Sequence, residues 1–447
     1  MLKLDSTGTL HKDMPTGWIS ELDQKARGVS RPPKADGKVV FIDGALPGEE
    51  VEYASYRKKP EFELAQLVRV RRPSAERVHP RCPHYGVCGG CTMQHLAADA
   101  QIAVKQRELE KCLWRIGKLR PDCILPPVLG QIWGYRRKAR MSVRRVEKKG
   151  GVLVGFHEKR SSYIADMQYC AILPTYVSDL LLPLRNLLGA LSICHRIPQI
   201  ELAAGDRCTA LVLRILAPLT AYDEALLRAF AEQHDVVFYL QPKGPASSYR
   251  FYPPENPPLD YGLPEYGLTY SFEPVDFTQV NHNMNNILVR RAMQLLDVQA
   301  GEHIVDLFCG IGNFTLPVAR LGARVTGLEG SESLVGRARN IARQHGLDAG
   351  FMQTDLFNPQ PHVLEEIAPC DKILLDPPRD GAVEFVKALA SSPLQPRRIV
   401  YVSCNPATLA RDSAILVHQQ GWRCQAAGVL NMFPHTAHVE SIALFVR

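Results

Sequence analysis

The chain has 447 residues, a formal net charge of +7 and twelve cysteines, and this length predicts roughly two to four domains rather than one core. It holds no apolar run of the length of about 18 residues that a membrane span needs and no signal-peptide segment near Met1, so we expect a soluble cytoplasmic protein. In that reducing compartment we do not expect a disulfide framework, and clustered cysteines indicate metal binding or catalysis.

Basic charge is concentrated in the first third of the chain. Residues 1–160 hold 31 Lys and Arg against 18 Asp and Glu, whereas the remainder holds 22 against 28. These two parts therefore carry +13 and −6. A solvated basic surface would give the same count, but an excess gathered around the run GYRRKAR is more typical of a phosphate-binding face. Nucleic acid is the predicted partner.

Short alternating segments separated by Pro and Gly turns occupy residues 17–72. Three of them, 37–43, 49–53 and 64–70, have the alternation of strands in a small β-barrel. The phrase DGKVVFIDGALPGEEV resembles a TRAM domain, an RNA-binding barrel appended to RNA-modifying enzymes. Residues 1–75 are therefore predicted to form an OB-like TRAM barrel.

Three cysteines follow the barrel within ten residues, spaced C-x5-C-x2-C: Cys82, Cys88 and Cys91. Their segment contains glycines and little apolar material, so packing does not explain them, and Cys170 is a possible fourth ligand. Four thiolates suit structural zinc or an iron-sulfur cluster, and the spacing alone favours the cluster only slightly. His84 is interpreted as a loop residue.

Residues 76–275 are predicted to form a central α+β domain around these cysteines. Apolar residues at helical spacing predict a helix over 97–119, for which packing against the C-terminal domain is one option. The remaining pattern predicts strands over 139–143, 152–156 and 200–203 and helices over 177–191 and 223–233.

A β-α-β pattern predicts a Rossmann-like α/β domain over residues 276–447. The strand 303–308 leads into the glycine-rich turn 309–313, and the next strand ends in Glu329, which is placed to accept both ribose hydroxyls of a nucleotide. The turn lacks a G-x-G-x-x-G phosphate cradle, which favours S-adenosylmethionine over a dinucleotide. Asp355 lies where a third strand would end and is a candidate to bond adenine.

Cys404 stands in the sequence SCNPATLARD, directly after the β-branched and aromatic run 398–402. This run predicts a buried strand that delivers the cysteine to the sheet edge where open α/β sheets bind ligands. An isolated cysteine is most often a core residue. The motifs around Cys404 favour a reactive thiol instead.

Taken in order, the barrel, C-x5-C-x2-C, FxQxN, DxFCGxGN, DPPR, SCNP and HTxHVE resemble the RNA uracil-C5 methyltransferases over nearly the whole chain. The likeness is greatest to the bacterial group that methylates uridine 1939 of 23S ribosomal RNA. It implies that Cys404 is the nucleophile and Glu440, in HTAHVE, the base. It also implies a [4Fe-4S] cluster on Cys82, Cys88, Cys91 and Cys170. Contacts to S-adenosylmethionine are implied for Gln279, Phe308, Asn313, Glu329, Asp355 and Asp376.

The chemistry of uracil explains these residue types. Carbon 5 is a poor nucleophile until a thiolate adds to carbon 6, and after methyl transfer a carboxylate must remove the proton from carbon 5. Glu440 is the only acid in the last 35 residues. A target base inside folded RNA must also be flipped out while Lys and Arg hold the backbone phosphates.

Other classes of protein share some of these features. Transfer RNA uracil-54 methyltransferases lack both the barrel and the cysteine set, and the group acting at another 23S site has the cluster without the barrel. Methylthiotransferases combine TRAM with an iron-sulfur cluster but use C-x3-C-x2-C. A non-catalytic RNA-binding iron-sulfur protein is an alternative only if Cys404 or Glu440 is not positioned for catalysis. The sequence implies neither a membrane nor an obligate protein partner.

Overall fold

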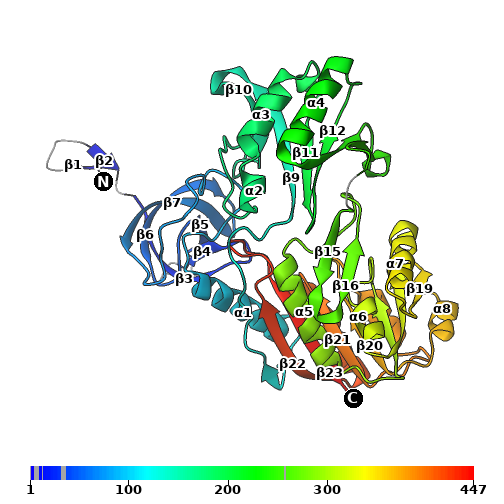
Figure 1. The fold of residues 1–447 in the computed structure, drawn as a ribbon. Coiled ribbons are helices and arrows are strands. Elements are labelled where there is room, and N and C mark those ends of the chain that lie inside the picture. Colours follow the sequence, from blue (N-terminus) through cyan, green and yellow to red (C-terminus); the bar gives the residue numbers. More distant parts are fainter. Residues whose placement is uncertain (1, 5–9, 13, 32–36, 256–257) are drawn as a thin grey trace.

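The computed structural model describes residues 1–447 except 1, 5–9, 13, 32–36 and 256–257. A short hairpin of β1 (Leu2–Leu4) and β2 (Leu10–Lys12) is followed by a barrel, a central domain and a C-terminal domain (Figure 1). Over this described part of the chain, none of the helices combines the length and apolar character needed to cross a membrane.

Five strands form the predicted barrel, which closes in the order β3-β4-β5-β7-β6. Ile19, Ile42 and Ala65 alternate with outward residues and are completely buried in its interior. The expectation of a small β-barrel is confirmed. Part of the adjoining loop, residues 32–36, lies outside the described residues. The strands are β3 (Thr16–Leu22), β4 (Arg27–Ser30), β5 (Val39–Asp43), β6 (Glu50–Lys58) and β7 (Phe62–Arg72).

The central domain is built on a six-stranded sheet in the order β10-β9-β11-β12-β13-β14. Its strands are β9 (Lys138–Val146), β10 (Gly151–Gly155), β11 (Gln199–Ala204), β12 (Thr209–Arg214), β13 (Val236–Gln241) and β14 (Tyr249–Tyr252). Its helices are α2 (Thr175–Ser178), α3 (Leu181–Ala190) and α4 (Ala221–His234). The single helix predicted over 177–191 is wrong, because the chain restarts a helix at Leu181. Pro183 then lies in the first turn of α3, where its missing N–H costs no hydrogen bond.

The C-terminal domain has an eight-stranded sheet in the order β19-β18-β17-β20-β21-β23-β22-β8. The first five strands are parallel and β23 is antiparallel to both of its neighbours, which confirms the Rossmann-like prediction. The strands are β17 (His303–Leu307), β18 (Arg324–Glu329), β19 (Gly350–Gln353), β20 (Lys372–Leu375), β21 (Arg398–Ser403), β22 (Arg423–Leu430) and β23 (Glu440–Val446). The short edge strand β8 (Cys123–Ile124) lies within the range predicted for the central domain but pairs with β22, and it was not predicted.

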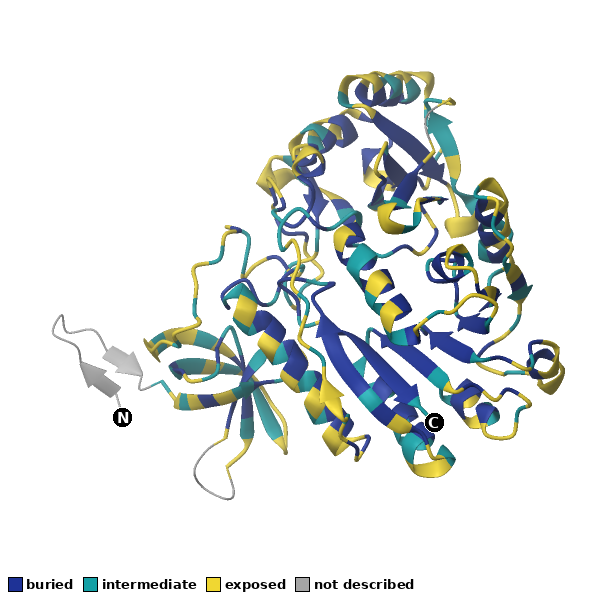
Figure 2. Ribbon diagram, turned by 60° about the horizontal axis from the view of Figure 1, so that its bottom comes forward, coloured by how far each residue is buried: buried dark blue, intermediate teal, exposed yellow. Residues whose placement is uncertain are grey.

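Helices cover both faces of this sheet, so its strands are buried, as the dark blue strands in Figure 2 show. In β17, Ile304 packs into the same core as Met284 of α5, whereas the next residue, Val305, packs into the core that holds Leu109 of α1. One face carries α5 (His282–Leu296), α6 (Thr315–Arg320) and α7 (Glu332–Gln344). The other carries α1 (Ala98–Arg115), α8 (Pro361–Glu366), α9 (Val383–Leu389) and α10 (Pro406–Gln420).

The helix predicted over 97–119 is α1, and it packs on α10 and β22 of the C-terminal domain. It ends at Arg115, earlier than predicted, because the chain turns at Gly117 and Lys118, which has a left-handed φ of 52°. A Cβ on Gly117 would lie 2.9 Å from the carbonyl oxygen of Ala410 in α10. Lys111 on α1 also forms an ion pair with Glu21 of the barrel at 2.7 Å, so α1 joins the two domains.

Candidate active site

Cys404 and Glu440 are brought together by strand pairing. In the antiparallel pair β21–β23, Ser403 lies opposite Ser441. The next residues outward along this register are Cys404 and Glu440. Directly opposite residues of an antiparallel pair project to the same face of the sheet. The two residues predicted as nucleophile and base therefore meet at the carboxyl edge of the sheet.

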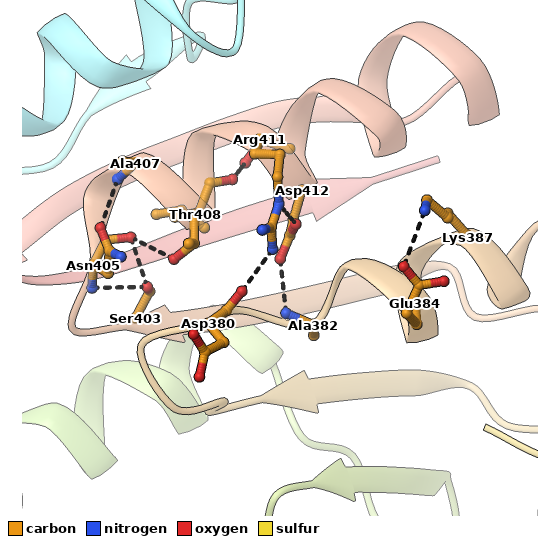
Figure 3. A network of polar contacts seen from close by, with 12 residues as sticks. Asp380, Ala382, Glu384, Lys387, Ser403, Asn405, Ala407, Thr408, Arg411 and Asp412 are labelled. Carbon is orange, nitrogen blue, oxygen red and sulfur yellow. Dashed lines mark hydrogen bonds and ion pairs between the residues drawn. The ribbon is translucent and has the colours of Figure 1, made fainter. Parts of the chain in front are cut away.

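Hydrogen bonds of Ser403 and Asn405, the residues on either side of Cys404, fix the turn after β21 (Figure 3). Asn405 caps α10, and its side-chain Oδ1 accepts a hydrogen bond from the N–H of Ala407 at 3.1 Å. The backbone N–H of Asn405 donates to the hydroxyl of Ser403, and that hydroxyl donates to the carbonyl oxygen of Asn405, both at 3.1 Å. Pro406 occupies the first helical position, where its fixed φ suits the helix. The half-buried thiol thus sits on a rigid turn.

The DPPR loop is fastened to the same helix, as Figure 3 also shows. Asn405 and Thr408 both donate side-chain hydrogen bonds to the carbonyl oxygen of Arg379, at 3.0 and 3.2 Å. The buried carboxylate of Asp412 accepts from the N–H of Ala382 at 2.8 Å. Between them Gly381 has φ 79°, and a Cβ there would lie 2.6 Å from a guanidinium nitrogen. These bonds keep Arg379 beside the cysteine turn.

Charged neighbours act on the thiol of Cys404 in opposite directions. Burial, followed by the carboxylates of Glu440 and Asp376, raises its pKa to about 11, although the guanidinium of Arg379 acts to lower the pKa. The Nη2 of Arg379 lies 3.1 Å from the Nδ1 of His438, which orients that guanidinium. Arg379 is therefore the cation that favours the thiolate.

Two carboxyl groups share this buried edge. Burial raises the pKa of Glu440 well above its ordinary value, and the negative charge of Asp376 adds to the effect. Burial also raises the pKa of Asp376 to about 7. A carboxylate whose pKa is shifted towards neutrality is a stronger base than an exposed one. Family resemblance implied Asp376 as a cofactor contact, and in the structure its charge also acts on Cys404 and Glu440.

The glycine-rich turn after β17 is shaped for close approach of a ligand. Phe308, Gly310 and Gly312 have φ values of 63°, 57° and 90°, so this turn runs repeatedly through the left-handed region. The carboxylate of Glu329, at the end of β18, accepts hydrogen bonds from the N–H groups of Gly310 at 3.1 Å and Ser331 at 3.0 Å. Its position is fixed at the edge where the strands end.

Two other predicted cofactor residues, Asp355 and Gln279, lie on other segments of the chain. Asp355 is exposed two residues after β19 and accepts the N–H of Phe357 at 2.9 Å. The rings of Phe357 and Phe308 meet edge to face with centroids 5.7 Å apart. Gln279 is half-buried just before α5. Sequence reasoning missed Phe357, because a single exposed aromatic residue in a loop belongs to no motif.

Asn313 ends the glycine-rich turn and is held on two sides. Its amide forms a reciprocal pair with the amide of Asn285 on α5, with both hydrogen bonds at 2.9 Å. Its Oδ1 also accepts a hydrogen bond from the hydroxyl of Tyr261 at 3.1 Å. The side chain is therefore oriented before any ligand arrives.

The four predicted cluster cysteines are all buried: Cys82, Cys88, Cys91 and Cys170. Burial, helped by the charges of Cys88 and Cys82, raises the pKa of Cys91 to about 11. The N–H of Gly90 donates to the sulfur of Cys88 at 3.3 Å. Within the described part of the chain, however, no group of three or more His, Cys, Asp and Glu side chains is arranged to hold a metal ion.

The loop 431–439, which leads into Glu440, is supported by residues that sequence reasoning missed. Lys105 of α1 is buried, and its Nζ donates to the Oδ1 of Asn431 and the carbonyl oxygen of Phe433, each at 2.8 Å. Burial lowers the pKa of this lysine to about 7. A single lysine in an amphipathic helix carries no sequence signal of burial, because such residues are ordinarily solvated.

Comparison with known proteins agrees with this geometry. A family described as "tRNA (Uracil-5-)-methyltransferase" matches residues 360–447, and one described as "Methyltransferase domain" matches residues 304–367. The chain is 58% identical to the 23S rRNA (uracil(1939)-C(5))-methyltransferase RlmD of Dechloromonas aromatica, over 97% of this chain and 99% of that protein. It is also 58% identical to the protein of the same name from Nitrosospira multiformis, over 96% and 98% of the two chains.

A solved structure shares the whole fold. It is the Pyrococcus abyssi tRNA (uracil-54, C5)-methyltransferase in complex with S-adenosyl-L-homocysteine. The match has a TM-score of 0.74 and covers 97% of this chain and 100% of that chain at 24% identity. At this identity the likeness shows a common fold.

Proposed function

The chain belongs to the family of 23S rRNA (uracil(1939)-C(5))-methyltransferases, and from this premise we propose that it methylates its uridine through a covalent bond between Cys404 and carbon 6. It is an S-adenosylmethionine-dependent RNA uracil-C5 methyltransferase. The observation that supports the covalent route is that Cys404 and Glu440 flank the last residue pair of β21 and β23, Ser403 and Ser441, and that the charge of Glu440 acts on the thiol of Cys404.

Each step has a residue suited to it. The thiolate of Cys404, favoured by Arg379, adds to carbon 6 and leaves an enolate whose electron pair is shared with carbon 5. Carbon 5 takes the methyl group from the sulfonium, and the electron pair of the broken C–S bond stays on the sulfur of S-adenosylhomocysteine. The carboxylate of Glu440 then accepts the carbon-5 proton, and the electron pair of that C–H bond expels the thiolate. Product and free Cys404 are released together.

S-adenosylmethionine, when bound, supplies an electrophilic methyl group on a sulfonium. We propose that Glu329 accepts the ribose hydroxyls and that Asp355 and the Phe308 ring receive the adenine. The support is their common position at the strand ends around the glycine-rich turn. Gln279, Asn313 and Asp376 complete the proposed set.

We also propose that Cys82, Cys88, Cys91 and Cys170 hold a [4Fe-4S] cluster. The support is the donor set itself, because four buried thiols come from two separate segments and the electrostatic effects of Cys88 and Cys91 on Cys170 place these side chains near one another. A cluster would supply an anchor between the cysteine segment and the central domain. A zinc ion is the alternative occupant.

We propose that the barrel is a TRAM domain and that the RNA binds in a basic groove along it. Lys25, Arg57 and Arg160 are exposed along it. The guanidinium of Arg160 stacks on the exposed ring of Tyr56 at 4.2 Å, an arrangement that suits a phosphate beside a stacked base. Because ribosomal RNA is the substrate, the proposed site of action is the bacterial cytoplasm.

The defining experiment maps 5-methyluridine in the ribosomal RNA of cells that lack this protein. Loss of the modification at uridine 1939 alone, restored by the wild-type chain and not by Cys404→Ala, is the expected result. Loss from transfer RNA with intact 23S RNA would favour the tRNA enzyme class. Unchanged modification in both RNAs would contradict the proposed activity.

A further inference from the structure

A β-hairpin that contains none of the sequence motifs packs against the glycine-rich turn. Its strands are β15 (Asp260–Leu263) and β16 (Leu268–Ser271), and they pack into the core of the C-terminal domain. The rings of Tyr261 and Tyr270 are buried and parallel, with centroids 5.0 Å apart and an interplanar angle of 5°. Two phenol hydroxyls are thereby brought to the same side of the glycine-rich turn.

Both hydroxyls donate to that turn. Tyr261 donates to the Oδ1 of Asn313 at 3.1 Å, and Tyr270 donates to the carbonyl oxygen of Gly312 at 3.3 Å. Asn285 donates the second hydrogen bond to the Oδ1 of Asn313. Both lone pairs of this oxygen are therefore used, and the amide presents only its remaining N–H to a ligand. Asn313 is thus set as a donor, which suits a carboxylate.

The hairpin is itself fixed to the central domain. Asp206, in the turn between β11 and β12, accepts the N–H of Gly262 at 2.9 Å, and its own N–H donates to the carbonyl oxygen of Asp260 at 2.7 Å. A Cβ on the preceding Gly205 would lie 2.7 Å from that carbonyl oxygen, so the turn fits tightly on the hairpin. The hairpin that carries both tyrosines is consequently held in place by the central domain.

We infer that Tyr261 and Tyr270 are positioning residues of the S-adenosylmethionine site, holding residues 312–313 so that Asn313 presents a hydrogen-bond donor to the amino-acid carboxylate of the cofactor. This inference rests on the proposed function, because it presumes that the glycine-rich turn binds this cofactor. Neither hydroxyl contacts the reacting atoms, so both residues act through the turn.

Tyr261→Phe and Tyr270→Phe test the inference, because phenylalanine keeps the stacked rings and removes only the hydroxyls. Tyr266→Phe, at the tip of the same hairpin, is the matched control. Calorimetric titration of the intact protein with S-adenosylhomocysteine should show a Kd raised about 2- to 10-fold in each of the first two variants, as for loss of one hydrogen bond. The control should bind like wild type.

Steady-state kinetics separates positioning from general damage. We expect KM for S-adenosylmethionine to rise in Tyr261→Phe and Tyr270→Phe while kcat at saturating cofactor and the melting temperature stay near the wild-type values. Wild-type affinity in both variants, or an equal loss in Tyr266→Phe, would overturn the inference and leave the proposed function intact. Failure of the wild-type protein to bind S-adenosylhomocysteine would instead overturn the proposed function.

Discussion

The hydroxyl of Ser441 donates a hydrogen bond to the carbonyl oxygen of Ser403 at 2.9 Å. Both residues are buried, and they are the immediate neighbours of Glu440 and Cys404. A slip of one residue between the two strands would turn Glu440 to the opposite face of the sheet. The distance between the proposed nucleophile and base is therefore fixed by the core of the sheet rather than by flexible loops.

Asp376 should make stability depend on pH. Burial raises the pKa of its carboxyl to about 7 from an ordinary 3.8, so the ionised form is the one that the fold disfavours. Its contribution to stability is complete below about pH 4 and is lost as pH rises through about 7. Asp376→Asn should therefore melt above wild type at pH 8, by about 2 to 4 °C for each kcal/mol, with little advantage at pH 5.

Thermal unfolding at pH 5, 6, 7 and 8 measures this difference, with Asp348→Asn, an exposed residue, as the matched control. The control should follow wild type throughout. An advantage of Asp376→Asn that is the same at every pH would contradict burial of the charge as its cause.

Glu329 should govern cofactor affinity. Its carboxylate is already fixed by two backbone N–H groups, so its loss removes charge-assisted hydrogen bonds without a compensating rearrangement. Glu329→Ala should weaken S-adenosylhomocysteine binding by roughly 1.5 to 3 kcal/mol in calorimetry with the cofactor product alone. Glu332→Ala, three residues later and exposed, is the control. An unchanged affinity for Glu329→Ala would place the ribose contact elsewhere.

The sequence predicted the sheet of the C-terminal domain where its strands are short, buried and followed by a motif, as at Glu329 and Cys404. It did so because parallel strands read as continuous apolar runs and deliver their polar residues to one edge. That Cys404 and Glu440 lie close together and act on the same base was implied by the family resemblance alone. An antiparallel register between segments so far apart in the chain leaves no mark on either segment.

The contacts that sequence reasoning missed share a physical cause. Tyr261 and Lys105 lie far from the motifs in sequence and become meaningful only when the fold packs their elements against the glycine-rich turn and the loop 431–439. Burial of a lysine or a tyrosine hydroxyl is a tertiary property. Local periodicity reports which face of a helix is apolar but not which polar group that face encloses.

The basic groove on the barrel should make RNA binding sensitive to salt. Lys25→Ala and Arg57→Ala together should weaken binding of a 23S RNA fragment and make the slope of log affinity against log salt less negative by about 1.4, as for two phosphate contacts to unpaired RNA. Affinity for S-adenosylhomocysteine should not change. Filter binding across a salt series gives both quantities.

Arg343→Ala, an exposed arginine on α7, is the matched charge control for these variants. It should retain the wild-type slope. Identical slopes for the barrel variants and the control would contradict a role of the barrel groove in phosphate binding.

The cysteine segment should influence the active site through one carbonyl group. The N–H groups of Thr92 and Met93, directly after Cys91, donate to the carbonyl oxygen of His435 at 2.9 and 3.0 Å, five residues before Glu440. If Cys91 is a cluster ligand, Cys91→Ser should lose iron and sulfide, and through this link it should lower methyl transfer. Affinity for S-adenosylhomocysteine should be retained, because the glycine-rich turn proposed to bind it lies elsewhere. Metal and sulfide analysis of anaerobically purified protein, absorbance near 400 nm and calorimetry measure these effects.

Cys123→Ser, which changes the exposed cysteine in β8, is the matched control and should keep wild-type iron content and activity. Stoichiometric zinc without iron in the wild-type protein would contradict the cluster. An unchanged iron content in Cys91→Ser would exclude Cys91 as a ligand.

The order of the chemical steps separates the two catalytic residues. Cys404→Ala should form no covalent bond to RNA, because it removes the thiol at the end of β21 on which the charge of Glu440 acts. Glu440→Gln should still add to carbon 6 and accept the methyl group, but it should stall before release because the amide cannot take the proton from carbon 5. Denaturing electrophoresis should show a protein–RNA adduct that carries the methyl group in Glu440→Gln and none in Cys404→Ala.

RNA with 5-fluorouracil at the target should trap the wild-type protein in the same form, since fluorine on carbon 5 cannot leave as a proton. Mass spectrometry should find the nucleotide on Cys404. A nucleotide on Cys309 or Cys424, or full turnover by Cys404→Ala, would overturn this mechanism.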